Sequence, residues 1–379
     1  MLIDLPSRSD EAWRWSDLSA LPEIAERKPA RTVPRELPWI DCALEGPRVL
    51  FVDGKLAADE SRLGPIGIGP VERHEEDHAL TRLIGSEGWV LRLDRDHAPA
   101  GVVQLVHVST GAADHLPARI ALEDDAQASV VETFIGDGWS NRVGSITLGG
   151  GARLMLARRL LGSGGFVSIT DRARLGAGAS FTLSTLAAGA ADSRLDTQLL
   201  LDGEGGYAEI GGALLARGRQ RHDANVVLRH GQPGGVSRQL WRSVADDQAA
   251  CSVAARVEVA RGAQKTDGEQ SLKGLLLNRG ATINAKPELE IFADDLKCAH
   301  GATVGELDRN ALFYMASRGV PEAEARALLT RAFVADAIAR IGEEAVRDAF
   351  GRDVVACFST LPSGEREGPA AAGGGWVRE

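Results

Sequence analysis

Short alternating runs of apolar and polar residues fill the chain from about residue 91 to residue 291. Runs such as residues 128–135 and 208–210 have the two-residue period of half-buried β-strands. Steps such as Asp202-Gly203 and Gly234-Gly235 interrupt any longer helical period. The pattern therefore predicts short strands joined by frequent tight turns.

A weak internal repeat makes this all-β prediction more specific. Small turn-like pairs recur at a spacing of about 28 residues, which lies in the range of stacked structural repeats. A solenoid of coils, each with two or three strands, would place small residues at turns, β-branched and leucine residues inside and polar residues outside. We therefore predict a parallel β-helix, with a large antiparallel sandwich or barrel as the alternative. The pairs are Gly151-Ala152, Gly178-Ala179, Gly206-Tyr207, Gly235-Val236 and Gly262-Ala263.

The two ends of the chain differ from this strand region. Residues 1 to about 50 contain six prolines among short helix-compatible pieces, which predicts a helical and extended entry segment. A helical period begins after Asp308, and Gly319 followed by Pro321 is typical of a turn between two helices. The predicted divisions are 1–90 for the N-terminal helical and extended region, 91–305 for the β-helix core, 306–358 for a C-terminal helical domain and 359–379 for a disordered tail.

The C-terminal helices can be predicted in more detail. The second helix, over about residues 321–341, is expected to bury one apolar stripe. A third helix, over residues 343–350, is expected to end at Gly351, and the tail that follows has too little apolar content to fold alone. The predicted stripe consists of Ala325, Leu328, Leu329, Phe333 and Ile338.

Composition and charge narrow the function classes. The chain has 379 residues, 44% of them hydrophobic and 25% charged, which is close to the globular average and ample for a core. The formal net charge of -10 offers no basic surface for nucleic acid or an anionic membrane. The sequence has neither an apolar run of about 18 residues nor the pattern of a signal peptide. We expect a cytoplasmic protein that binds neither nucleic acid nor membranes.

Motifs of several enzyme classes are incomplete in this chain. His74 and His78 match the H-E-x-x-H pattern, in which a helix presents two imidazoles to zinc. The acidic residues between them and the lack of an evident third ligand favour a charged, solvated turn, with a zinc site as the alternative. The glycine-rich loops lack the Gly-Lys-Ser/Thr ending that binds nucleotide phosphates, and the four cysteines form no CxxC pair. We expect no bound nucleotide and no disulfide framework.

Cys298 and His300 are the strongest candidates for metal chemistry. The two residues are separated by one position, so an extended chain would place both side chains on the same face. Thiolate and imidazole suit iron, iron–sulfur clusters, zinc or copper. Two ligands do not complete such a site, so a partner chain would supply the others. The alternative is a buried thiol beside a histidine that is bonded to a backbone carbonyl.

Three segments of the chain resemble known sequences. Residues 287–329 (PELEIFADDLKCAHGATVGELDRNALFYMASRGVPEAEARALL) closely resemble the signature of the SufB/SufD family of iron–sulfur cluster assembly proteins. Residues 264–284 (QKTDGEQSLKGLLLNRGATIN) and 11–18 (EAWRWSDL) are also similar to that family. The chain length and the form DDLKCAHGATVG are those of the SufD branch, because SufB carries a CGAH-type element here. Ala299 and Leu296 depart from the usual serine and valine, which leaves the candidate ligands in place.

The resemblance implies a right-handed parallel β-helix between helical ends. It also implies a SufBCD complex, in which a SufD-type chain pairs with SufB through the β-helices and docks the ATPase SufC on its C-terminal helices. A nascent iron–sulfur cluster, or iron, is expected to be bound transiently at the interface with SufB. His300 maps onto the contributing histidine, with Cys298 as its neighbour. The expected docking residues are Leu312, Phe313, Tyr314, Arg318, Gly319, Leu328 and Phe333.

Other arrangements stay open at this point. A SufD-type subunit can steady its partners without contacting the cluster, and the isolated chain can form a homodimer. A stand-alone polysaccharide-active β-helix would need a pair of cooperating carboxylates. Asp294 and Asp295 are adjacent, so a strand would direct them to opposite faces. We therefore expect a non-catalytic scaffold subunit.

Overall fold

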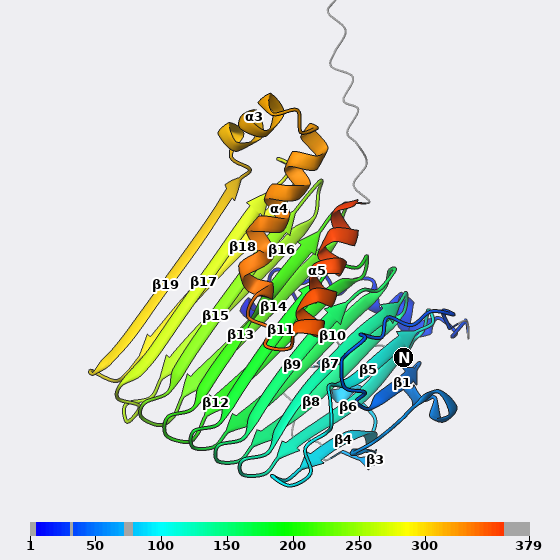
Figure 1. The fold of residues 1–379 in the computed structure, drawn as a ribbon, viewed down its shortest axis with the longest axis vertical. Helices are drawn as coiled ribbons and strands as arrows, with labels where there is room; N and C mark the ends of the chain where they lie inside the picture. Colours follow the sequence, from blue (N-terminus) through cyan, green and yellow to red (C-terminus); the bar gives the residue numbers. More distant parts are fainter. Residues whose placement is uncertain (1–4, 31–32, 72–78, 360–379) are drawn as a thin grey trace, which may run out of the picture.

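The computed structural model describes residues 5–30, 33–71 and 79–359. Its centre is a parallel β-solenoid of about eight turns, in which successive strands alternate between two sheets (Figure 1). The ten-stranded sheet contains, in spatial order, β19 (Leu296–Glu306), β17 (Thr266–Leu276), β15 (Val236–Ala245), β13 (Tyr207–Ala216), β11 (Ser180–Ala187), β9 (Arg153–Leu160), β7 (Gln127–Gly136), β5 (Val103–Ser109), β1 (Arg48–Val52) and β2 (Lys55–Leu56).

The second sheet faces the first, and helices flank both ends of the chain. The nine-stranded sheet contains β18 (Thr282–Ile291), β16 (Ala250–Val259), β14 (Arg221–His230), β12 (Asp192–Leu201), β10 (Phe166–Leu175), β8 (Trp139–Leu148), β6 (Ala113–Leu122), β4 (Glu87–Leu93) and β3 (Ile66–Pro70). The helical elements are η1 (Glu11–Trp13), α1 (Leu21–Glu26), η2 (Ala58–Glu60), α2 (Ala79–Arg82), α3 (Arg309–Ser317), α4 (Glu322–Ile338) and α5 (Glu344–Ser359).

Stacked turns explain why this sequence forms a solenoid. Gln127 on β7 lies beside Arg153 on β9, which lies beside Ser180 on β11, so each coil takes up one repeat of the sequence. At the turns, Gly151 and Gly178 adopt φ angles of 66° and 62°, in the left-handed region that glycine enters without steric cost. Each of their N–H groups donates to a carbonyl of the next coil at 2.8 Å. The parallel pairing confirms the predicted β-helix and excludes the antiparallel alternative.

Alternate residues of each strand point into the space between the sheets and form apolar rows. Leu156, Leu183 and Ile210 occupy equivalent positions on three neighbouring strands, and all three are buried. Each such row removes apolar area from water, which is worth about 25 cal/mol per Å². The hydrophobic core of the solenoid is therefore continuous from coil to coil.

Four charged side chains interrupt this apolar interior, and we call them the interior ion network. Glu132 and Arg158 come from the ten-stranded sheet, and Arg142 and Asp171 come from the nine-stranded sheet; each is at most 3% exposed. Arg158 contacts Glu132 at 2.9 Å and Asp171 at 2.5 Å, and Arg142 contacts the same two carboxylates at 2.9 and 2.7 Å. Burial opposes ionisation, but the two guanidinium groups hold the pKa of Glu132 well below its usual value. The network links the two sheets through the core.

Asp114 on β6 is another buried carboxylate, and among the described residues it has no ion pair like those of the interior ion network. Its side chain is 8% exposed and accepts a hydrogen bond from the Ser140 hydroxyl at 3.1 Å. Burial raises the pKa of Asp114 to about 7. Because this value lies above that of the unfolded chain, the folded state binds more protons, and stability falls as the pH rises from about 4 to about 7.

Asp114→Asn is therefore expected to stabilise the protein at high pH and not at low pH. The gain in the free energy of unfolding should approach about 4 kcal/mol at pH 8 and vanish near pH 4, where the carboxyl group is protonated in both states. Urea unfolding of both proteins at the two pH values measures the difference. An equal effect at the two pH values would contradict the raised pKa.

The N-terminal segment lies on the outer face of the nine-stranded sheet. The Arg194 guanidinium of β12 stacks over the buried Trp13 ring, 4.3 Å from the ring centroid. The same guanidinium contacts Asp196 at 2.6 Å and Asp223 at 2.5 Å, and the Ser16 hydroxyl also donates to Asp223. A buried cation with two carboxylates and an aromatic ring thus fixes the segment to β12 and β14.

The solenoid begins before residue 91, the predicted start of the core. β1 runs parallel to β5 in the ten-stranded sheet, and β4 runs parallel to β6 in the nine-stranded sheet from Trp89 onwards. The strands at this end are short and alternate with loops, so too few residues share one period to give a clear strand signal. The region before residue 91 therefore contains strands of the solenoid as well as helical segments.

Helices α4 and α5 lie against the outer face of the ten-stranded sheet, and α3 projects beyond it (Figure 1). Val334 of α4 is fully buried in this contact. Two ion pairs also join the helices to the sheet, Arg242 with Asp336 at 2.9 Å and Arg159 with Asp353 at 2.7 Å. Within the described ranges, no helix is long and apolar enough to span a membrane.

Two details of the predicted helices are wrong. Leu328 of the predicted stripe is 40% exposed, because α4 packs closely on the flat sheet through small or β-branched side chains. α5 continues through Gly351 to its end, since this glycine lacks the positive φ of a helix stop and the following turns pack on the sheet. Residues 360–379, most of the predicted tail, lie outside the described ranges. The buried residues of α4 are Ala325, Thr330, Val334 and Ala337.

Candidate functional site

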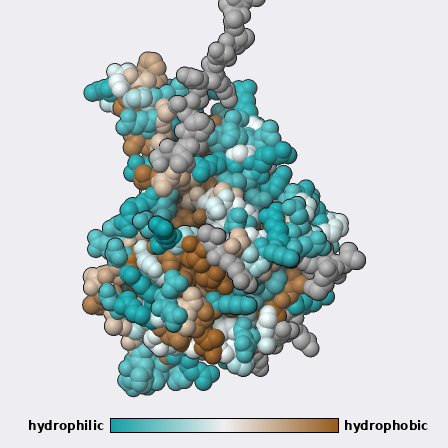
Figure 2. All heavy atoms as spheres, turned by 90° about the vertical axis from the view of Figure 1, so that its right-hand side faces the viewer, coloured by the Kyte–Doolittle hydropathy of each residue, from teal (hydrophilic) through white to brown (hydrophobic). Residues whose placement is uncertain are grey.

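The last coil ends on two strand edges that have no neighbour among the described residues. β18 pairs only with β16 and β19 only with β17, and the two strands form what we call the open end (Figure 1, β19 at the left). At the other end, each sheet finishes with a short antiparallel strand, β2 or β3. Figure 2 shows that side, where hydrophobic patches lie between hydrophilic regions. An unpaired edge presents backbone N–H and C=O groups to which a further strand can bind.

Cys298 and His300 lie on β19, within the open end. The register places Cys298 opposite Gly268 and His300 opposite Gln270, and both residues of β17 are buried in the interior. Residues two apart on a strand share a face, so both candidate ligands lie on the interior side of β19. The structure thus places Cys298 and His300 on the same side of β19 at the open end.

The backbone groups of the same two residues face the free edge. On β17, the N–H of Asp267 donates to the carbonyl of Gly235, the residue just before β15, at 3.0 Å. Lys297 is the register partner of Asp267 and directs its N–H toward β17 in the same way. Because alternate residues of a parallel strand direct their backbone groups to opposite sides, Cys298 and His300 direct theirs away from β17. The edge that can bind a strand and the candidate ligands are therefore formed by the same residues.

Pro287 makes the edge of β18 less continuous than the edge of β19. The N–H of Thr282 donates to Ala249 at 2.9 Å, so the even-numbered residues of β18 face β16. Pro287 consequently faces the free side, where its missing N–H costs the existing sheet no hydrogen bond. A partner strand on β18 would lack one donor at this point, so β19 is the better edge for pairing.

The two candidate ligands differ in their surroundings. Cys298 is half-buried, and its Sγ lies 3.1 Å from the position that a Cβ on Gly268 would occupy. Burial raises the pKa of the Cys298 thiol above its usual value. His300 is exposed, and no set of three metal-ligating side chains occurs in the part of the chain that the structure describes. Any metal held at the open end would need further ligands from elsewhere.

Trp15 lies at the rim of the open end, which the sequence analysis did not predict. Its half-buried ring lines a cleft of about 420 Å³ together with residues 283–286 of β18 and 302–304 of β19. Lys286 contacts Glu11 of the N-terminal segment at 2.7 Å, which holds this segment beside β18. The only feature of the sequence that points to Trp15 is the pair of tryptophans in EAWRWSDL. The place of this segment beside β18 depends on long-range contacts of Trp13, which the sequence does not reveal.

Comparison with known proteins gives the family. A family model described as "SUF system FeS cluster assembly, SufBD core domain" matches residues 107–333, which is more than half of the chain. The chain belongs to the SufB/SufD family. The match includes β19, so both Cys298 and His300 lie within the matched residues.

Relatives of this SufB/SufD family member occur in bacteria and archaea. The iron–sulfur cluster assembly protein SufD of Escherichia coli is 26% identical over 368 residues, which cover 90% of this chain and 87% of the relative. A SufBD family protein of Synechocystis is 30% identical over 59% of this chain and 52% of its own length. A SufBD family protein of Pyrococcus horikoshii is 31% identical over 43% of this chain and 36% of its own length. The chain is thus a SufD-like member of the SufB/SufD family, as its sequence motifs indicated.

The docking residues expected from the family lie on or near α3 and α4. Phe313 and Tyr314 are 77% and 58% exposed, and the Arg318 guanidinium lies 5.1 Å from the Tyr314 ring centroid. Gly319 ends α3 with a φ of 82°, as its sequence context predicted. Leu312 and Phe333 are half-buried, whereas Leu328 is exposed. α3 contains no buried residue, so its aromatic side chains are available to a partner.

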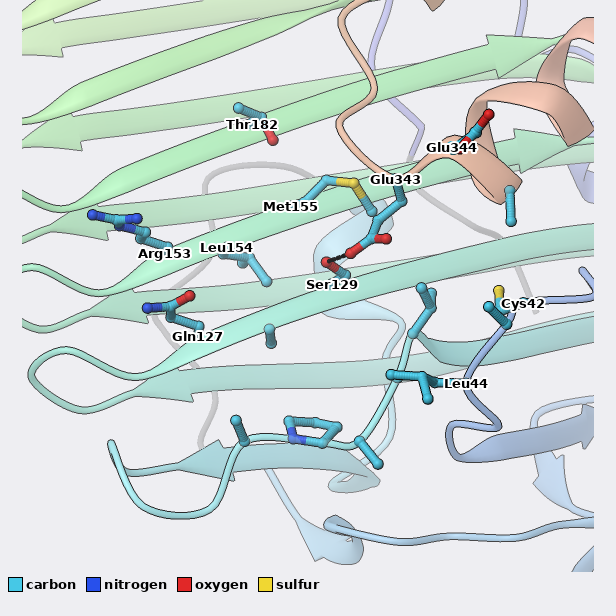
Figure 3. Close-up of a pocket in the computed structure, with 18 of the residues that line it drawn as sticks. Cys42, Leu44, Gln127, Ser129, Arg153, Leu154, Met155, Thr182, Glu343 and Glu344 are labelled. Atoms are coloured by element: carbon cyan, nitrogen blue, oxygen red, sulfur yellow. Dashed lines mark hydrogen bonds between the residues drawn. The ribbon is translucent and has the colours of Figure 1, made fainter.

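Two other candidates from the sequence and the surface do not join this site. His74 and His78 of the H-E-x-x-H pattern lie outside the described residues. A cleft of about 790 Å³ separates the start of α5 from the segment around Cys42, and there Ser129 donates to Glu343 at 2.8 Å (Figure 3). This cleft lies over β7, β9 and β11 and does not include the open end.

Proposed function

We propose that this SufD-like chain is a scaffold subunit of a SufBCD-type complex. It pairs with a SufB chain through the open end and docks the ATPase SufC on α3 and α4. It contributes His300, with Cys298 beside it, to the place where iron and sulfide are assembled into a cluster. The cluster or iron is cargo that is bound transiently and shared with SufB. The chain itself binds no nucleotide and catalyses no reaction.

One observation carries this proposal. The free edge of β19 and the candidate ligands belong to the same residues, so a chain that pairs with this edge comes directly beside His300. Two ligands alone do not complete a metal site. A partner that pairs there can supply the others, and the exposed His300 side chain supports a site that is completed on association.

Exposed aromatic residues support the docking of a second partner. Phe313 and Tyr314 on α3 are large apolar side chains in a helix that packs little against the rest of the molecule. Such side chains are frequent anchors of protein–protein interfaces. SufC is the partner that the family relationship suggests for this surface, and ATP hydrolysis is assigned to it.

The cytoplasmic location expected from the sequence stays a prediction.

A proline at Ala302 tests the pairing through β19. Ala302 lies two residues after His300 on β19, so its N–H also faces the free edge. Ala302→Pro therefore removes a hydrogen-bond donor that only a partner strand would use. We expect the unaltered chain to co-purify with SufB when it is co-expressed with SufB and SufC, and we expect Ala302→Pro to lose this co-purification. Ala302→Ser, which keeps the N–H, should assemble normally.

The mass and subunit ratio of the purified complex provide the measurement. A complex of one SufB, two SufC and one copy of this chain is expected for the unaltered protein. Assembly of the Ala302→Pro variant in that ratio and with unchanged affinity would contradict pairing through β19. Elution of the unaltered chain alone, or as a homodimer that excludes SufB, would contradict the scaffold role.

A further inference from the structure

Two glutamines lie in the interior of the solenoid directly behind His300. Gln239 on β15, Gln270 on β17 and His300 on β19 are neighbours in one row of the ten-stranded sheet. Gln239 and Gln270 are 1% and 2% exposed. This polar row replaces the apolar rows of the earlier coils only near the open end, because Ile210 is the next residue inward.

The hydrogen bonds of the two side chains fix the direction of each amide group. The Nε2 of Gln270 donates to the Ala255 carbonyl at 2.8 Å, and the Nε2 of Gln239 donates to the Arg256 carbonyl at 3.1 Å. Each Oε1 therefore points away from the carbonyl of the facing sheet. Neither Oε1 has a hydrogen-bond donor among the residues that the structure describes. A buried acceptor without a donor is costly and uncommon in native proteins.

His300 can supply the donor that Gln270 lacks. It is the register neighbour of Gln270, it lies on the same interior side of the sheet, and an imidazole in its neutral form carries one N–H. A histidine that binds a metal generally donates its other ring N–H to a carbonyl or carboxylate, which fixes the tautomer and the ring orientation. A carboxamide does this without adding a charge to the interior.

We propose that Gln270 is a positioning residue for His300. Its Oε1 accepts the N–H of one ring nitrogen, so that the other nitrogen presents its lone pair at the open end. The inference rests on the proposed function for the role of His300 toward iron, whereas the proposed hydrogen bond involves residues of this chain alone. Cys298 has no equivalent side chain behind it, because its register neighbour is Gly268.

Gln239 provides a matched control for this proposal. It has the same burial, the same type of Nε2 hydrogen bond and the same unpaired Oε1 as Gln270. Its neighbours in the row are Ile210 and Gln270, so it does not reach His300. Gln270→Leu and Gln239→Leu remove the same atoms, and only the first removes the proposed acceptor for His300.

The tautomer of His300 is the first readout. In protein labelled with ¹⁵N-histidine at about pH 8, the ¹⁵N shifts of the His300 ring are expected to show one dominant tautomer. Gln270→Leu should give a mixture of both tautomers, while Gln239→Leu should match the unaltered protein. Gln270→Glu, which keeps an acceptor at this position, should restore a single tautomer. An unchanged tautomer ratio in Gln270→Leu would overturn the proposal.

Ferrous iron binding to the purified complex is the second readout. Loss of a hydrogen-bond partner behind a metal-bound histidine typically weakens metal binding about 10- to 100-fold, and this is the loss expected for Gln270→Leu but not for Gln239→Leu. If Gln270→Leu folds poorly by circular dichroism, Gln270→Met repeats the comparison with a flexible side chain. Equal iron affinity of the Gln270 and Gln239 variants would overturn the positioning role. Unchanged iron affinity in His300→Ala would contradict the proposed function, whereas the tautomer readout would still test the hydrogen bond.

Discussion

Replacing His300 by alanine is expected to abolish the accumulation of iron and sulfide on the assembled complex while the complex itself stays intact. The His300 side chain is exposed at the open end, so its removal leaves no cavity in the core. Its backbone N–H stays available at the free edge of β19, so pairing with SufB should not change. Iron and acid-labile sulfide, determined in the anaerobically purified complex, should fall to the background of the preparation.

Lys297→Ala is the matched control for this experiment. Lys297 is an exposed residue of the same strand, and its side chain lies on the other face of β19. The control should keep both the subunit ratio and the iron and sulfide content. If His300→Ala also keeps them, the chain supports its partners without contacting the cluster, and the ligand role of His300 is wrong.

Cys298 can be separated from His300 in the same assay. Burial raises the pKa of the Cys298 thiol, so the thiol is protonated near neutral pH unless a metal displaces the proton. Cys298→Ala keeps the backbone edge and removes only the thiol. Loss of iron in both variants would assign both ligands, whereas loss in His300→Ala alone would leave the histidine as the contribution of this chain.

Removing one cation from the interior ion network should cause the largest loss of stability. Arg158→Met keeps much of the side-chain volume but leaves Glu132 and Asp171 with only Arg142 as a cationic partner in the network. Breaking a buried ion pair by removing one member typically costs about 3–5 kcal/mol, because an uncompensated charge remains in the interior. We expect a loss of this size in the free energy of unfolding, measured with urea.

Arg174→Met provides the surface comparison. Arg174 contacts Asp202 at 2.5 Å, but its side chain is 67% exposed. Water and salt screen such a pair, so this substitution should cost less than about 1 kcal/mol. A similar small loss for Arg158→Met would mean that the interior ion network contributes no more than a surface pair.

The stacked strands could be predicted from the sequence because the turns repeat. Gly151 and Gly178 mark successive coils at nearly the same position, and their left-handed conformation is one that most other residues avoid. The interior ion network could not be predicted in this way. Glu132 lies in a run of alternating apolar and polar residues, and only the register of β7 with β9 shows that it faces Arg158 in the core.

The candidate site was predictable to a similar, limited extent. Cys298 and His300 could be placed on one face because a strand has a fixed period of two residues. Gln270 could not be connected with His300, because the pairing depends on the length of the loops and of β18 between them. The position of Trp15 could not be predicted either, because it depends on the contact of Trp13 with Arg194, a residue far away in the sequence.

The open end also has a thermodynamic consequence. In a solenoid each coil is stabilised by the coils above and below it, and within residues 5–30, 33–71 and 79–359 the coil formed by β18 and β19 has a neighbouring coil on one side only. It therefore opens at a lower free energy than the central coils, and its backbone amides exchange with solvent sooner. A partner strand on β19 would replace the missing neighbour and slow this exchange. Under the proposed function, the ordering of the strand that carries His300 is thereby linked to subunit association, and free chains are expected to bind iron less well than assembled ones.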